Sequence, residues 1–88
     1  MKTDGIIFQL SEARKHLDDL IQELHVGKLT EEDDSSLQVH VEHILDHLCF
    51  AWSGRNLSVP DYSDLSQEDF ERLCHTVPNL YGPRTLEP

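Results

Sequence analysis

The chain has 88 residues, and its 17 Asp and Glu side chains against 7 Lys and Arg give a net charge of −10. This excess of negative charge repels phosphate groups, so we expect no direct nucleic-acid binding and no binding to anionic membranes. The length suits a single helical domain over residues 1–88, with a core small enough to favour self-association. We find neither a leader-like basic and apolar start nor an apolar run near the ~20 residues of a membrane span. We therefore expect a cytoplasmic protein.

The first helix is predicted over about residues 7–26 from the spacing of its apolar side chains. Steps of three and four residues place these side chains on one stripe of a helix, the a and d positions of a heptad. The stripe consists of Leu10, Ala13, Leu17, Leu20 and Leu24. Gly27 is expected to end the helix, because glycine adopts the left-handed conformation of the C′ position without penalty. Residues 1–6 and 79–88 are expected to be flexible or extended ends.

A second helix is predicted to begin just after Thr30, with Glu31–Asp34 in its first turn, and to end near Trp52 or Ser53. Its apolar stripe repeats the spacing of the first. The stripe consists of Leu37, Val41, Ile44, Leu48 and Ala51. Thr30 and Asp33, three residues apart, are typical of a helix-capping pair, and Gly54 is expected to follow the last turn.

A loop over residues 55–65 and a short third helix over about residues 67–76 complete the predicted elements. The loop contains several turn-forming residues. Ser66, followed three residues later by Asp69, predicts the start of the third helix, and Pro78 is expected to end it. The apolar face of this helix consists of Phe70, Leu73, Cys74 and Val77.

Folding the chain about residue 30 brings the two apolar stripes together as an antiparallel helical hairpin, in which every a position meets a d position. The predicted pairs are Leu24–Leu37, Leu20–Val41, Leu17–Ile44, Ala13–Leu48 and Leu10–Ala51. The predicted fold class is therefore all-α, with a hairpin of two long helices and the third helix packed near its open end.

Additional apolar side chains lie beside these stripes, and a contact between two helices cannot bury all of them. They are Ile7, Ile21, Leu45 and Trp52. We expect the third helix or a second molecule to cover them, and we predict a homodimer that resembles a four-helix bundle. Phe50 lies off the stripe and is expected to contact either the third helix or a partner.

Three of the six histidines are candidates for a metal site. His43 and His47 lie one helical turn apart, and the hairpin register places His16 opposite His47. Imidazoles in this arrangement can bind Zn²⁺, Ni²⁺ or Cu²⁺, with Glu12 or Glu23 adding an oxygen ligand.

Two alternatives to a metal site remain open for these histidines. They can be polar side chains along one flank of the hairpin, with His40 paired to Glu23 across the two helices. They can also respond to pH, because several imidazoles among acidic groups gain protons near pH 6.

We predict a protein without enzymatic activity, because its residues match no nucleophile, calcium-binding or phosphate-binding pattern. Cys49 and Cys74 lie on different predicted helices without CxxC spacing and are expected to be reduced. No cofactor is expected unless the histidines bind a transition metal.

The predicted function is that of a small acidic module for protein interaction or regulation. Its partner would be a basic protein that is steered by the acidic turn and anchored by aromatic rings, if these are exposed. The residues predicted to bind this partner are Glu31, Glu32, Asp33, Asp34, Phe50 and Trp52. The alternative functions are a metal-binding helical protein that uses His16, His43 and His47, and an acidic mimic of nucleic acid.

Overall fold

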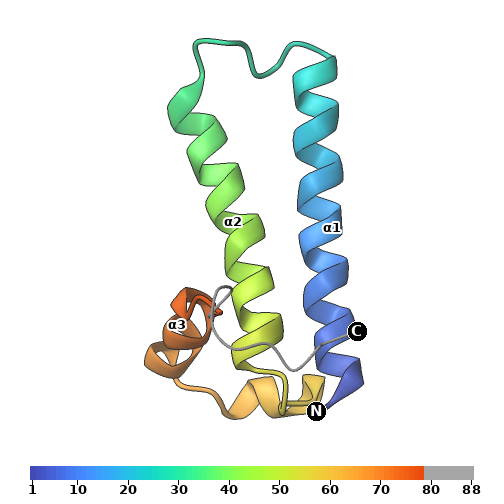
Figure 1. The fold of residues 1–88 in the computed structure, drawn as a ribbon, viewed down its shortest axis with the longest axis vertical. Coiled ribbons are helices and arrows are strands. Elements are labelled where there is room, and N and C mark those ends of the chain that lie inside the picture. Colours follow the sequence, from blue (N-terminus) through green and yellow to red (C-terminus); the bar gives the residue numbers. More distant parts are fainter. Residues whose placement is uncertain (79–88) are drawn as a thin grey trace, which may run out of the picture.

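The computed structural model describes residues 1–78, which form helices and loops without a strand among them. The elements in chain order are α1 (Thr3–His25), α2 (Asp34–Ser53), the 3-10 helix η1 (Val59–Asp64) and α3 (Gln67–His75). Helices α1 and α2 lie side by side and antiparallel, and α3 packs against α2 near the open end of the hairpin (Figure 1). The predicted all-α hairpin with a short third helix is confirmed. The end of the chain that was predicted to be extended lies outside the described residues.

Helix α1 begins at Thr3, four residues earlier than predicted, so the prediction of a flexible start is wrong. The backbone N–H of Lys2 donates to the carbonyl oxygen of Arg55 at 2.6 Å. The carboxylate of Asp4 accepts from the backbone N–H of Val59 at 3.0 Å. These contacts come from more than fifty positions further along the chain and hold the first turn of α1 against the segment that contains η1.

The turn between α1 and α2 has the predicted glycine, but Thr30 and Asp33 pair within the turn and do not cap α2, which begins about three residues later than predicted. Gly27 has a φ of +78°, which only glycine adopts without strain. The carboxylate of Asp33 accepts from the backbone N–H of Thr30 at 2.7 Å. The pair closes a turn just before the helix, and α2 itself begins at Asp34.

Helix α3 begins as predicted, because the Ser66 hydroxyl oxygen accepts from the backbone N–H of Asp69 at 3.0 Å. The preceding loop contains a 3-10 helix that the sequence analysis does not anticipate. The carboxylate of Asp61 accepts from the backbone N–H and the hydroxyl of Ser58 at 2.8 and 2.9 Å, and these bonds close the first turn of η1.

The core lies at the open end of the hairpin, around Phe50 of α2, which is 1% exposed. Its ring centroid lies 5.1 Å from that of Tyr62 in η1 and 5.6 Å from that of Phe70 in α3. Cys49 and Cys74 are buried beside it as free thiols, and burial raises the pKa of Cys74 to about 11. Phe50 therefore ties η1 and α3 to the hairpin, which confirms its expected contact with the third helix, and its burial rules out the alternative of an exposed anchor for a partner.

The contact between α1 and α2 keeps the predicted register along the helix axes. His40 Nε2 lies 3.1 Å from a carboxylate oxygen of Glu23. The rings of His16 and His47 stack with centroids 5.2 Å apart. Both pairs were predicted to be opposite each other in the hairpin.

The predicted apolar stripe of the first helix, by contrast, is buried only in part. Leu10, Leu17 and Leu24 are 45–49% exposed, whereas Ala13, Leu20 and the polar side chain of Gln9 are buried. Each helix is rotated so that its d and g positions, which include small and polar side chains, face the other helix. The leucine-rich a positions lie on one side of the hairpin as a result.

Candidate functional site

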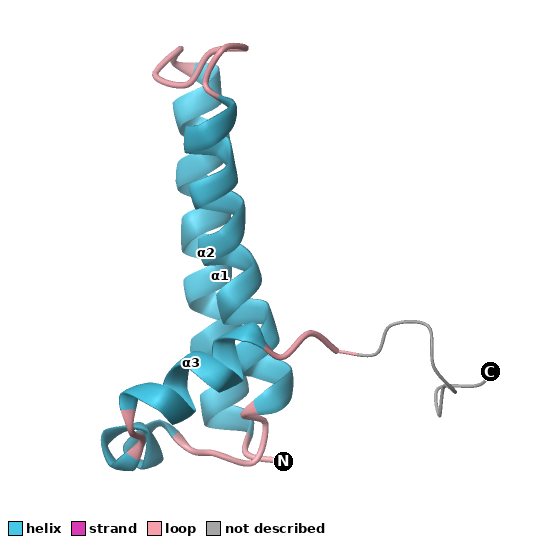
Figure 2. Ribbon diagram, turned by 90° about the vertical axis from the view of Figure 1, so that its left-hand side faces the viewer, coloured by secondary structure: helices cyan, strands magenta, loops and turns pink. Residues whose placement is uncertain are grey.

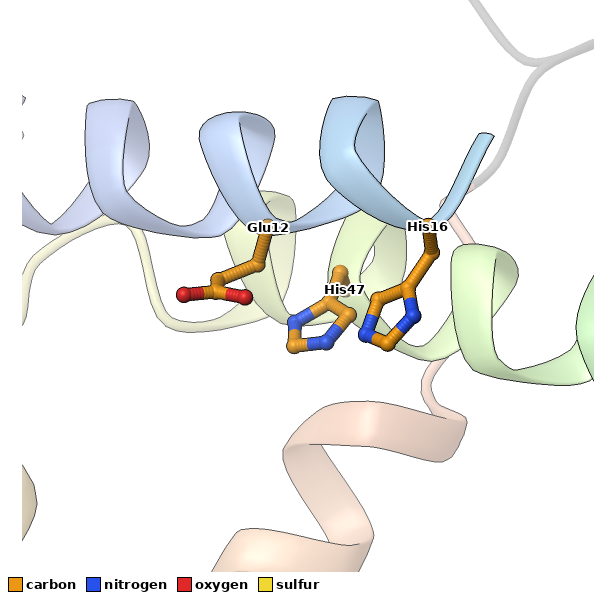
Figure 3. A group of neighbouring side chains, drawn as sticks. All are labelled: Glu12, His16 and His47. Carbon is orange, nitrogen blue, oxygen red and sulfur yellow. The ribbon is translucent and has the colours of Figure 1, made fainter. Parts of the chain in front are cut away.

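A cluster of polar side chains occupies the contact between α1 and α2. Glu12 and His16 project from successive turns of α1, and His47 projects from α2 beside them (Figure 3). All three residues are half-buried, and one nitrogen or oxygen atom from each lies within 4.8 Å of the others. The four-residue spacing on α1 and the hairpin register together produce this arrangement.

The orientation of His47 is set by Gln9, a buried residue on α1. The Gln9 side-chain oxygen lies 2.8 Å from Nδ1 of His47. Because an amide oxygen only accepts hydrogen bonds, Nδ1 carries the proton of the neutral ring and Nε2 keeps a free lone pair. Sequence reasoning missed Gln9, although its position one turn before Ala13 on the helix could have indicated it.

The surroundings of His47 favour the neutral imidazole. Burial lowers the pKa of His47 below its usual 6.5, and the nearby His16 and His43 rings lower it further. The carboxylates of Glu12 and Asp46 act in the opposite direction without reversing the shift. His47 is therefore neutral at pH 7, which is the form that donates a lone pair to a metal ion.

The structure brings together two of the three histidines predicted as metal ligands. His43 is exposed, and its ring centroid lies 5.7 Å from that of His16, outside the group of close ligand atoms. Glu12 takes its place, as one of the two glutamates considered from the sequence. The other, Glu23, lies further along the hairpin with His40.

A cleft of about 400 Å³ adjoins this cluster where α3 approaches the hairpin. Among its lining residues are Phe8, His16, His47, Tyr62 and Phe70. The walls are therefore aromatic on the side of η1 and α3, and the hairpin adds Phe8 and the two imidazoles. An ion or small molecule in the cleft would have direct access to the imidazoles.

A second candidate site is a set of exposed apolar side chains along one flank of each hairpin helix, which we call the apolar face. It consists of Ile7, Leu10, Leu17, Ile21, Leu24, Leu37, Val41, Leu45, Leu48 and Trp52, each 41–62% exposed. At 100° per residue these positions fall on one flank of each helix, beside the α1–α2 contact. Helix α3 crosses α2 near the open end of the hairpin (Figure 2), and Leu45 lines a cleft there together with Cys74 and Val77.

The residues predicted to bind a basic partner have different surroundings. Glu31, Glu32 and Asp34 are exposed at the closed end of the hairpin, whereas Asp33 is half-buried and bonded to Thr30. A role of these acids in partner binding stays a prediction.

Trp52 is the one predicted aromatic anchor that is accessible. It is 52% exposed, and the guanidinium carbon of Arg55 lies 4.2 Å from its ring centroid. Its ring belongs to the apolar face, so it is available to a molecule that contacts that face.

Comparisons with known proteins give no functional assignment. No protein-family model, curated protein or solved structure matches the chain. Within residues 1–78, none of the helices has the length and apolar character needed to cross a membrane. A functional proposal must therefore be derived from the geometry of the two candidate sites.

Proposed function

We propose that this chain is a non-enzymatic helical interaction protein that assembles as a homodimer through the apolar face. The observation that carries the proposal is the exposure of ten large apolar side chains on one side of a two-helix hairpin. Monomeric proteins rarely leave extended apolar surfaces in water, and such surfaces mark sites of association.

The geometry of the hairpin is that of half a four-helix bundle. In such a bundle each helix packs against two neighbours, using one flank of its apolar stripe for each. Here α1 and α2 use one flank for each other, and both leave the leucine-rich flank on the same side. A second hairpin, related by a two-fold axis parallel to the helices, would place its α1 over α2 and complete four antiparallel neighbours.

The size of the apolar face also fits a second copy of the chain. Its α1 and α2 halves each hold five side chains and have nearly equal length, so the surface matches itself. Ten half-exposed side chains of this size offer on the order of 800 Å², which is the area that each partner contributes to a stable interface.

Charge determines the conditions under which the dimer forms. Each copy has a net charge of −10, so two copies repel each other at low ionic strength. Repulsion between exposed charges is screened over about 8 Å at physiological salt, whereas the burial of apolar surface is unaffected by this screening. The dimer is therefore expected to tighten as salt is added.

The test is the mass of the full chain in solution, measured by analytical ultracentrifugation at several protein and salt concentrations. The wild type is expected to sediment at twice the chain mass of 10.1 kDa. Val41→Lys places a charge in the centre of the apolar face and is expected to give a monomer. Val39→Lys is a matched control, because Val39 is similarly exposed but points about 200° away from Val41 on the same helix.

Circular dichroism of both variants establishes that they remain helical. A dimer that is lost in Val41→Lys and kept in Val39→Lys supports the proposal. A wild type that remains monomeric at high protein and salt concentration contradicts it, as does a dimer that survives both substitutions.

A further inference from the structure

The polar cluster between α1 and α2 differs from an ordinary helix contact. Helices pack through apolar ridges and grooves, yet this contact contains a carboxylate, two imidazoles and a buried amide. Two histidines and one carboxylate are a ligand set that binds Zn²⁺ and other first-row divalent ions. We propose that Glu12, His16 and His47 bind one such ion, for which Zn²⁺ is the reference.

The three ligands project from two packed helices, so their backbone positions are well defined. Glu12 and His16 lie one turn apart on α1, and His47 faces them from α2 (Figure 3). Sites that are built on packed helices hold their ligands more accurately than sites on loops. The ion would also join α1 to α2 across their contact.

The distances between the ligand atoms are close to those of a metal site. The three atoms lie within 4.8 Å of one another. At metal–ligand distances of about 2.0–2.1 Å, tetrahedral ligand atoms are separated by roughly 3.4 Å. The remaining difference of roughly 1–2 Å is within the reach of side-chain rotation and requires no movement of the helices.

Gln9 supplies the outer interaction that metal-binding histidines require. In metal sites, the second ring nitrogen of a ligating histidine donates to a carbonyl or carboxylate oxygen, and this bond fixes the ring and its tautomer. The Nδ1–H of His47 donates to the Gln9 oxygen at 2.8 Å, which leaves Nε2 as the ring nitrogen with a free lone pair.

Three protein ligands leave one tetrahedral position for water or a small ligand, as in open zinc sites. The cleft of about 400 Å³ beside His16 and His47 provides the space for it. The site lies within one chain, on the α3 side of the hairpin, so it does not depend on dimerisation through the apolar face.

The test is calorimetric titration of the full chain with Zn²⁺ after removal of metals by chelation. We expect one ion per chain and a rise in melting temperature that a chelator reverses. Glu12→Gln and His47→Asn each remove one ligand, and each is expected to weaken Zn²⁺ binding about tenfold or more. Glu12→Gln keeps the shape of the side chain, so it separates ligand loss from misfolding.

His25→Asn is the matched control, because His25 is exposed at the end of α1, away from the cluster. It is expected to leave the Zn²⁺ affinity unchanged. The proposal is overturned if no stoichiometric binding occurs, if several ions bind weakly, or if the three variants bind Zn²⁺ equally well. None of these results bears on the dimer, which is tested with different variants.

Discussion

The side-chain oxygen of Gln9 on α1 lies 2.8 Å from Nδ1 of His47 on α2, 38 positions further along the chain. Gln9 is the one buried polar side chain among the described residues, at 4% exposure. A buried polar group is tolerated when it is hydrogen-bonded, and its loss leaves the partner unsatisfied. This bond therefore contributes to stability and also fixes the rotation of α1 against α2.

Gln9→Leu is expected to destabilise the fold by about 1–3 kcal/mol, because Nδ1 of His47 loses its acceptor in a half-buried position. Urea denaturation followed by circular dichroism measures this difference. Gln22→Leu is the matched control on the same helix, where the side chain is exposed, and it is expected to change stability by less than about 0.5 kcal/mol. Equal effects of the two substitutions would show that the bond between Gln9 and His47 contributes nothing.

The stability of the fold is expected to fall as the pH drops below 6.5. Burial lowers the pKa of His47 in the folded chain, and His16 and His43 add to the shift while Glu12 and Asp46 oppose it. The unfolded chain therefore binds more protons below pH 6.5, so the free energy of unfolding decreases as the pH falls. The contribution of His47 to stability is fully present above its pKa in the unfolded chain. It is lost as the pH falls through the lower pKa of His47 in the folded chain. Urea midpoints between pH 8 and pH 5 measure the decrease.

His47→Asn is expected to flatten this pH dependence, because asparagine does not titrate. The carboxylate of Asp61 acts in a separate window, since the backbone N–H and hydroxyl of Ser58 hold its pKa below the usual 3.8. Its contribution is lost only at more acidic pH. A slope between pH 8 and pH 5 that persists in His47→Asn would assign the effect to other groups.

The sequence predicts the helices and their register well, because both follow from local patterns. The spacing of Leu10, Leu17 and Leu24 indicates a helix whichever side of it faces a neighbour. The length of the turn at Gly27 then determines which residues lie at the same level, and this suffices to pair Glu23 with His40.

The rotation of each helix about its axis could not be predicted in the same way. The apolar e positions beside the a/d stripe widen it here, so several rotations of each helix bury apolar side chains. The rotation that each helix adopts depends on hydrogen bonds between polar side chains that are distant in the sequence, such as the bond between Gln9 and His47. A contact between only two helices predicts that the leucines are buried between them. The observed rotation instead leaves the leucines on the surface, where further helices could pack on them.

The early start of α1 and the 3-10 helix were unpredictable for a related reason. The first turn of α1 contacts residues more than fifty positions away, through Asp4 with Val59 and Gly5 with Tyr62. The local sequence around the first turn of α1 does not predict such contacts. The position of Glu12 beside His16 was predictable, by contrast, because helix spacing alone places the two residues one turn apart.

Gly5→Ala is expected to destabilise the chain by about 1–3 kcal/mol, as overpacking does. A Cβ atom at this position would meet the carbonyl oxygen of Leu57 and come within 3.0 Å of the Tyr62 hydroxyl. The same hydroxyl donates to the Gly5 carbonyl oxygen at 3.2 Å, so the close approach of Gly5 to Tyr62 allows a hydrogen bond that joins α1 to η1. Ser11→Ala, on an exposed part of α1, is the control and is expected to leave the melting temperature unchanged or slightly raised.

Phe50→Ala is expected to cost about 3–5 kcal/mol, because it opens a cavity in the fully buried part of the core. The lost ring contacts both Tyr62 and Phe70, so η1 and α3 are expected to loosen together from α2. Phe70→Ala removes the same kind of ring from a position that is 44% exposed, and its cost is expected to be clearly smaller. Denaturant midpoints compare the two variants, and hydrogen exchange shows whether α3 loses protection before α1. A larger loss in Phe70→Ala would mean that α3, and not Phe50, is the centre of the core.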